Sequence, residues 1–188
     1  MKFLKRATLT LLLLALVLFL GRGWVYRQLV WYEAAGPRPI YRATNKVLIR
    51  TIEARLSEHP AAEVKDVVQL AQDITARQLM YRATRTANDP NQLVASRRAH
   101  CVGYAAFCAT TCNYLFARRH QDKVWQARPQ LGRLYFLGEN VNRYFSSPFF
   151  RDHDFVLIEN RQTGERLAVD PTISDYLGID EVALRELK

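Results

Sequence analysis

Apolar residues are concentrated at the N-terminus, where residues 7–20 form a leucine-dominated run of 14 residues. A helix of that length spans about 21 Å, which is shorter than the ~30 Å hydrocarbon core of a bilayer. Continuing the helix to Tyr26 gives 20 residues and includes Arg22, whose long side chain can reach the lipid–water interface. The run is preceded by positively charged Lys2, Lys5 and Arg6. The pattern predicts a membrane anchor or signal segment over residues 1–27.

Two outcomes fit this segment. In the first, which the lack of an Ala-x-Ala cleavage site favours, the segment stays attached as a single-pass anchor. Its interfacial aromatic belt would then consist of Trp24, Tyr26, Trp31 and Tyr32. In the second, residues 1–23 are removed by a cut before Trp24, and the protein is secreted. Both outcomes place the rest of the chain outside the cytoplasm, and residues 28–39 are expected to be a linker.

Helical periodicity dominates the next part of the chain. Residues 40–58 carry an imperfect apolar stripe, and apolar positions in residues 61–84 follow the spacing of one helix face. Residues 88–92 (NDPNQ) predict a loop. Residues 99–119 predict a third helix of small and aromatic residues, with basic residues in its last turn, where the helix dipole favours them.

After this helix the period of the pattern changes to that of strands. The loop expected at residues 139–152 is polar and aromatic, and the last two strands are joined by a turn that contains Gly164. The segments expected to be extended are residues 124–128, 133–137, 153–159 and 166–169. Helices followed by antiparallel strands predict an α+β fold, in one domain over residues 40–188.

The net charge of +9 raises the question of nucleic-acid binding. Five of the 27 basic residues precede Glu33, and this leaves 22 basic residues against 18 acidic ones in the rest of the chain. Since no basic stripe alternates with stacking aromatic residues, we expect no nucleic-acid partner. The three cysteines are an odd number and do not form a disulfide framework.

One cysteine has the surroundings of a nucleophile. Cys101 lies at the start of the third predicted helix, where the partial positive charge of the helix N-terminus favours a thiolate. His153 opens the first strand of the C-terminal hairpin and Asp170 closes the second. With the turn centred near residue 162, His153 faces a position near 171, so Asp170 lies close enough to orient the imidazole. An acid that orients a base, and a base that activates a thiol, form a catalytic triad.

These residues lie in three segments: HCVGYAAFCATTCNYL, HDFVLIEN and LAVDPT. Together the segments resemble the transglutaminase-like superfamily of cysteine enzymes, which share a papain-like core. The resemblance covers about residues 66–172 and implies that Cys101 is the nucleophile, His153 the general base and acid, and Asp170 the orienting carboxylate. The chain departs from the family in having Asp154 and Phe155 after the histidine, where a Trp is frequent.

The resemblance also implies an architecture and an activity. The cysteine-bearing helix would pack on an antiparallel sheet, and the enzyme would act on amide bonds of peptides or proteins through a thioester acyl-enzyme. Whether water or an amine accepts the acyl group, which separates a hydrolase from an acyltransferase, is left open. The alternative from another class is a catalytically silent envelope module for binding or scaffolding.

Other candidate groups have less support. Gln92 could supply an oxyanion-hole amide, and His100 could line the cleft, although its side chain points about 100° away from that of Cys101. Cys108 and Cys112 share a helix face with Cys101, but a zinc site needs ligands that converge from different elements. We therefore expect Cys108 and Cys112 in the core, and neither a metal nor a cofactor.

Overall fold

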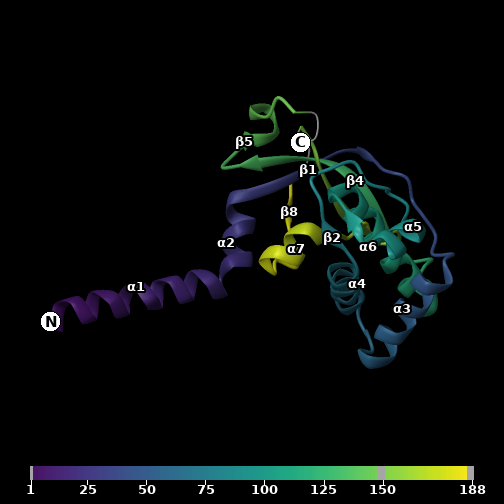
Figure 1. Ribbon diagram of the computed structural model, residues 1–188, viewed down its shortest axis with the longest axis horizontal. Helices are drawn as coiled ribbons and strands as arrows, with labels where there is room; N and C mark the ends of the chain where they lie inside the picture. The colour runs from purple at the N-terminus through teal and green to yellow at the C-terminus, as the bar shows by residue number, and fades with distance from the viewer. Residues whose placement is uncertain (1, 148–150, 186–188) are drawn as a thin grey trace.

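The structure, a computed structural model, describes residues 2–147 and 151–185. The domain contains a six-stranded sheet with the order β7-β6-β4-β1-β8, and the short β5 pairs with β4 (Figure 1). All of its pairs are antiparallel except that of β1 with β8. The strands are β1 (Val30–Pro37), β4 (Trp125–Phe136), β5 (Glu139–Asn140), β6 (His153–Asn160), β7 (Arg166–Val169) and β8 (Ala183–Leu184). The expectation of a mixed α+β fold is confirmed.

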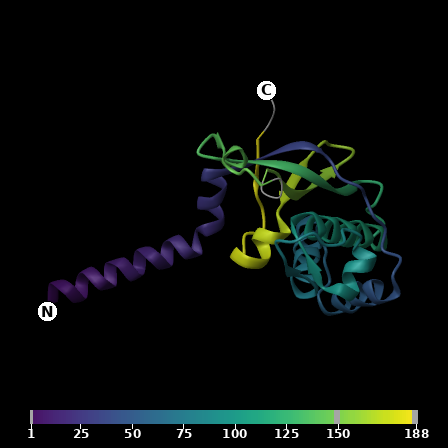
Figure 2. The ribbon, with the colours of Figure 1, turned by 45° about the horizontal axis from the view of Figure 1, so that its top comes forward.

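Most helices form a layer on one face of this sheet (Figure 2). α6 packs against β4 and β6, and α4 packs against α6. The helices of the domain are α3 (Lys46–Glu58), α4 (Val64–Gln78), α5 (Pro90–Ser96), α6 (Cys101–Arg118) and α7 (Pro171–Leu177), with a 3₁₀ helix at Val141–Tyr144. A separate parallel pair, β2 (Met80–Tyr81) and β3 (Arg98–Ala99), leads the chain into α6.

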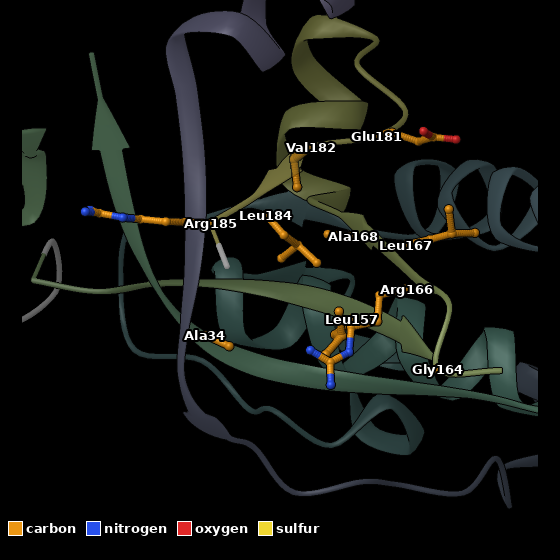
Figure 3. A pocket seen from close by; sticks show the side chains of 10 residues that line it. All are labelled: Ala34, Leu157, Gly164, Arg166, Leu167, Ala168, Glu181, Val182, Leu184 and Arg185. Atoms are coloured by element: carbon orange, nitrogen blue, oxygen red, sulfur yellow. The ribbon is translucent and has the colours of Figure 1, made fainter. Parts of the chain in front are cut away.

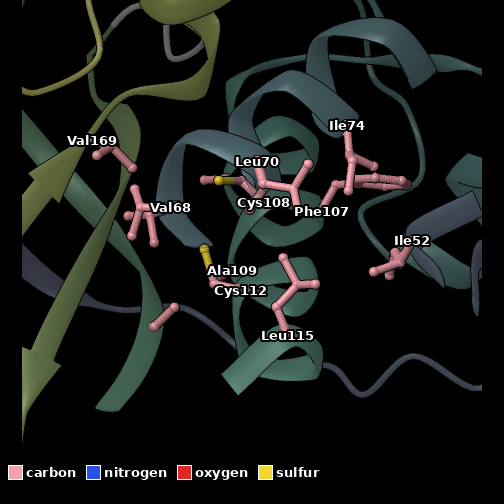
Figure 4. Close-up of a cluster of buried hydrophobic side chains, with 14 of the residues drawn as sticks. Ile52, Val68, Leu70, Ile74, Phe107, Cys108, Ala109, Cys112, Leu115 and Val169 are labelled. Carbon is pink, nitrogen blue, oxygen red and sulfur yellow. The ribbon is translucent and has the colours of Figure 1, made fainter. Parts of the chain in front are cut away.

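The buried apolar core fixes the position of α6 (Figure 4). Phe107, Cys108 and Cys112 on α6 are fully buried, and they share a cluster with Val68 of α4 and Val169 of β7. The expectation that Cys108 and Cys112 lie in the core is therefore confirmed. Because close-packed interiors tolerate little displacement, this contact also fixes where the first residue of α6 lies relative to the sheet.

The segment expected to be a linker is part of the sheet. β1 covers most of residues 28–39 and pairs with β4 from Val30↔Phe136 to Pro37↔Gln130. Tyr32, expected in an interfacial aromatic belt, is completely buried in this strand. The aromatic and β-branched residues at its start favour a strand.

Several predicted boundaries of helices and loops were wrong, because capping side chains and strand pairing set the ends of these elements. The helix expected over residues 40–58 begins only at Lys46, where the Asn45 side chain accepts the Val47 N–H. The helix expected over residues 61–84 ends at Gln78, because Met80 and Tyr81 pair with β3. The expected loop at residues 88–92 contains the start of α5, which Asp89 caps.

The strand predictions were more accurate near the C-terminus. The two runs expected at 124–128 and 133–137 form one strand, β4, which passes through Pro129 and Gly132. The loop expected over 139–152 contains β5 and a 3₁₀ helix, and its residues 148–150 lie outside the described residues. The expected hairpin of residues 153–169 is confirmed as β6 and β7.

The N-terminal segment extends away from the domain as α1 (Lys2–Leu20), followed by α2 (Arg22–Leu29), in both views (Figures 1 and 2). Within the described residues, neither helix alone has the length and apolar content needed to cross a membrane. By length and composition, one pair of helices among the described residues meets that requirement, Thr8–Leu20 with Arg22–Leu29, and the two helices are bent by 70° relative to each other.

Candidate active site

Cys101 is the first residue of α6, and the chain before it explains why the helix starts there. His100 is extended, and its Nδ1 accepts the Val102 N–H at 3.2 Å, which caps the helix. Cys101 is thereby placed in the first turn, where backbone N–H groups have no partner within the helix. Its residue surface is 5% exposed, so the thiol lies at the base of the site rather than on the surface.

His153 and Asp170 come from neighbouring strands. The pair Val156↔Val169 sets the register of β6 and β7, and counting three positions outward puts His153 opposite position 172 rather than 171. Asp170 is thus two positions from direct opposition, on the same face of the sheet, where long side chains still meet diagonally. His153 Nε2 lies 2.6 Å from Asp170 Oδ2.

The thiol of Cys101 lies next to the imidazole. Burial alone would raise the pKa of this thiol. Hydrogen bonds from the His100 and His153 side chains, the charge of His153 and the Asp154 N–H outweigh that effect and lower the pKa to about 6. Because Nε2 of His153 is engaged by Asp170, the other ring nitrogen, Nδ1, is the one available to the sulfur.

The pKa shifts of His153 and Asp170 agree with an ion pair between a Cys101 thiolate and a His153 imidazolium. Burial would lower the pKa of His153, but the charge and hydrogen bond of Asp170, together with those of Cys101, raise it well above its ordinary value. Burial would raise the pKa of Asp170, but the charge and hydrogen bond of His153 keep it below its usual range. At neutral pH the three groups form an alternating row of negative, positive and negative charge.

Tyr32 is a member of the site that the sequence did not reveal. Its hydroxyl donates to Asp170 Oδ2 at 2.8 Å, the same oxygen that contacts His153. Burial and the nearby charge of Asp170 raise the pKa of Tyr32 well above its ordinary value, so the phenol stays protonated and remains a donor. The only signal was the β-forming character of the segment in which Tyr32 lies.

Arg38 and Asp154 form an ion pair next to His153. Arg38 Nε and one terminal nitrogen contact the two carboxylate oxygens of Asp154 at 2.8 and 2.9 Å. Asp154 is fully buried and directly follows His153, and its N–H is the one directed at the Cys101 sulfur. The bidentate ion pair therefore holds the backbone segment that lies between the Cys101 sulfur and His153.

The two weaker candidates have different outcomes. His100 is buried at the N-terminus of α6 and hydrogen-bonds the Cys101 thiol, so it lies in the site. Gln92 is exposed on α5, and its side chain forms no hydrogen bond with Cys101, His153 or Asp170 in the part of the chain that the structure describes. Among the described residues, no three His, Cys, Asp or Glu side chains are placed to hold a metal ion.

A hollow of about 650 Å³ lies elsewhere on the sheet, between β7 and β8 (Figure 3). Its walls include Leu157 and Ala168, which alternate along their strands with residues of the main core and so face away from α6. None of Cys101, His153 and Asp170 lines it. The chemistry-bearing groups and this hollow are therefore separate features.

Comparison of the chain with protein-family models, curated proteins and solved structures gives no match. The functional argument therefore rests on the geometry of the site.

Proposed function

We propose that this protein is a membrane-tethered cysteine enzyme of the transglutaminase-like type, acting on amide bonds of peptides or proteins. The observation that carries the proposal is the continuous set of contacts from the Cys101 thiol through His153 to Asp170, with the thiol pKa lowered to about 6. A depressed thiol pKa beside an oriented imidazole is what nucleophilic cysteine catalysis requires.

The reaction follows from the charges of the site. The Cys101 thiolate attacks the amide carbonyl, so that a carbon–sulfur bond forms and the carbonyl oxygen becomes negative. Imidazolium His153 then gives its proton to the leaving amine as the carbon–nitrogen bond breaks, which leaves a thioester on Cys101 and a neutral imidazole. Water or an amine, deprotonated by that imidazole, attacks the thioester and releases the product and the thiolate.

The negative oxygen needs a donor, and the helix terminus offers one. The Cys101 N–H lies in the first turn of α6, beside the carbon that its own sulfur attacks. The macrodipole of an 18-residue helix adds a partial positive charge there. Exposed Gln92 is not needed for this role.

The membrane part of the proposal rests on α1. Its apolar side chains are exposed to an unusual degree, from 51% for Leu16 to 71% for Leu20. A contiguous apolar surface of this kind marks a membrane or protein contact. The positive charges at its N-terminal end favour an orientation with the domain outside the cytoplasm.

The decisive experiment is alkylation of the full chain in detergent with iodoacetamide across pH, with each cysteine followed by peptide mass spectrometry. Cys101 should react with a midpoint near pH 6, whereas buried Cys108 and Cys112 serve as unreactive internal controls. Intact-mass analysis after acid quenching of a mixture with peptide substrates should show an acyl adduct that Cys101→Ala lacks. If Cys101 reacts no faster than an ordinary thiol below pH 8.5, the enzyme proposal fails and the silent binding or scaffold module replaces it.

A further inference from the structure

The carboxylate of Asp170 belongs to two structures at once. Its Oδ1 accepts the N–H groups of Thr172 and Ile173 at 2.9 and 3.2 Å, so that Asp170 caps α7. Its Oδ2 is hydrogen-bonded to His153 Nε2 and accepts the Tyr32 hydroxyl. Any force that moves α7 or Tyr32 is therefore transmitted to the group that orients the imidazole.

The opposite end of α7 is held by the N-terminal segment. Arg22, at the start of α2, donates through Nε to the Leu177 carbonyl and through a terminal nitrogen to the Gly178 carbonyl at 3.1 Å. Its other terminal nitrogen donates to the Phe19 carbonyl at the end of α1. Gly178 has φ +60°, and a Cβ there would come within 2.5 Å of the Arg22 guanidinium. Arg22 thus connects the last turn of α1 to the last turn of α7.

A second contact links the same face of α2 to Asp170. Tyr26 lies one helical turn after Arg22, and its hydroxyl is 2.7 Å from the hydroxyl of Tyr32. Because Tyr32 donates to Asp170, its oxygen is left to accept from Tyr26, and the hydroxyls form a directed row that ends at Asp170. Donors in such a row polarise and strengthen one another.

We propose that α2, the helix that follows the apolar N-terminal helix, positions Asp170 through Arg22 and Tyr26, so that displacement of the N-terminal segment changes the reactivity of Cys101. The inference rests on the proposed function and adds to it a means of regulation. Arg22 and Tyr26 are positioning residues, since neither touches the sulfur. Attachment of α1 to a bilayer would hold α2 in place and keep the site in its reactive state.

The test uses the full chain in detergent and the pH profile of Cys101 alkylation. Arg22→Met removes every donor while keeping the length of the side chain. Arg27→Met is the matched control, because Arg27 also lies on α2 and its side chain forms no hydrogen bond or ion pair with the described residues. Loosening of α7 should move Asp170 away from His153, weaken the imidazolium and raise the midpoint of Cys101 alkylation. We expect Arg22→Met to slow alkylation at pH 6 about fivefold, the lower end of typical coupling between sites. Arg22→Lys should restore part of the rate, and Tyr26→Phe should act in the same direction.

Asp170→Asn separates this coupling from a general loss of structure. Asparagine can still cap α7 through its side-chain oxygen, but it carries no charge for His153. In that background Arg22→Met should produce no further slowing. Two results would overturn the coupling without touching the proposed function. In the first, Arg22→Met still slows Cys101 alkylation about fivefold in the Asp170→Asn background. In the second, the alkylation profile of Arg22→Met coincides with that of Arg27→Met while Cys101 of the wild type reacts at low pH. A wild-type Cys101 that reacts only above pH 8.5 would instead remove the proposed function itself.

Discussion

Replacing His153 with alanine should change the alkylation profile of Cys101 in a way that reverses with pH. In the wild type, a thiol pKa of about 6 leaves about 90% thiolate at pH 7, whereas the ordinary value of 9.0 would leave about 1%. Burial raises the pKa of this thiol, and the His100 hydrogen bond lowers it together with the hydrogen bond and charge of His153. Removing both His153 contributions should move the pKa of the thiol in the variant toward 9.0, and 9.0 sets the upper limit of the magnitudes.

The size of the effect includes a loss of intrinsic nucleophilicity. With a Brønsted coefficient of about 0.4–0.5, a thiolate whose pKa is three units lower attacks about 16- to 32-fold more slowly. Combining both factors, the wild type should react about 15- to 30-fold faster at pH 6, and the variant about 8- to 16-fold faster at pH 9. The two profiles should cross between about pH 7.5 and 8.

The assay is the iodoacetamide rate of the Cys101 peptide, measured at half-unit pH steps on the full chain. The imidazole lies next to the sulfur of the 5%-exposed Cys101, so its removal also eases access to the thiol. That change multiplies the rate by the same factor at every pH and leaves the change of the ratio with pH intact. His59→Ala, at the exposed end of α3, is the control and should keep the wild-type profile. Profiles of wild type and His153→Ala that stay parallel across this range would refute the assignment of His153 as the partner of the thiol.

Three further perturbations test the surroundings of this pair. Tyr32→Phe leaves Asp170 Oδ2 with one donor fewer, so unfolding by heat in detergent should show a loss of about 1–3 kcal/mol. Gly132→Ala would place a Cβ 2.6 Å from the His153 carbonyl oxygen, so it should destabilise the fold by about 1–3 kcal/mol and slow alkylation of Cys101, whereas Gly36→Ala, with open space around it, should do neither. The lowered pKa of Asp170 means that its charge stabilises the fold above the unfolded value near pH 4 and that this stabilisation is lost as pH falls through the folded value. Urea unfolding of the wild type should therefore weaken more steeply below pH 4 than that of Asp170→Asn.

The parts of the site that the sequence predicted depend on local signals. The hairpin from β6 to β7 joins residues close in sequence through a Gly-containing turn, and this brings His153 and Asp170 together. The start of α6 is local as well, since His100 caps it. The one-position difference in the register estimate matters, because the estimated register would put Asp170 opposite residue 154, on the other face of the sheet from His153. In the actual register Asp170 lies opposite residue 155, so both side chains are on one face.

The parts that the sequence did not predict depend on distant partners. β1 is a strand because it pairs with β4, about a hundred positions away, and Trp31 and Tyr32 taken alone fit a membrane interface equally well. The position of Gln92 upstream of the cysteine suggests an oxyanion-hole amide, but its side chain on α5 is exposed to solvent. The approach of Cys101 to His153 depends on α6 packing across β4 and β6, and no spacing along the chain encodes that contact.

The Asp-Pro-Thr sequence at residues 170–172 serves two purposes: it starts helix α7, and it supplies the carboxylate that contacts His153. A short polar side chain that can accept a hydrogen bond is needed to cap α7, and Asp170 accepts the Thr172 and Ile173 N–H groups. Pro171 suits the first helical position. Capping alone would accept asparagine at residue 170. Stabilising imidazolium His153 requires a carboxylate, and burial of that carboxylate requires donors on its second oxygen, which His153 and Tyr32 provide. The helix cap therefore fixes the position of the Asp170 side chain. Its negative charge is not required for that cap and acts on His153.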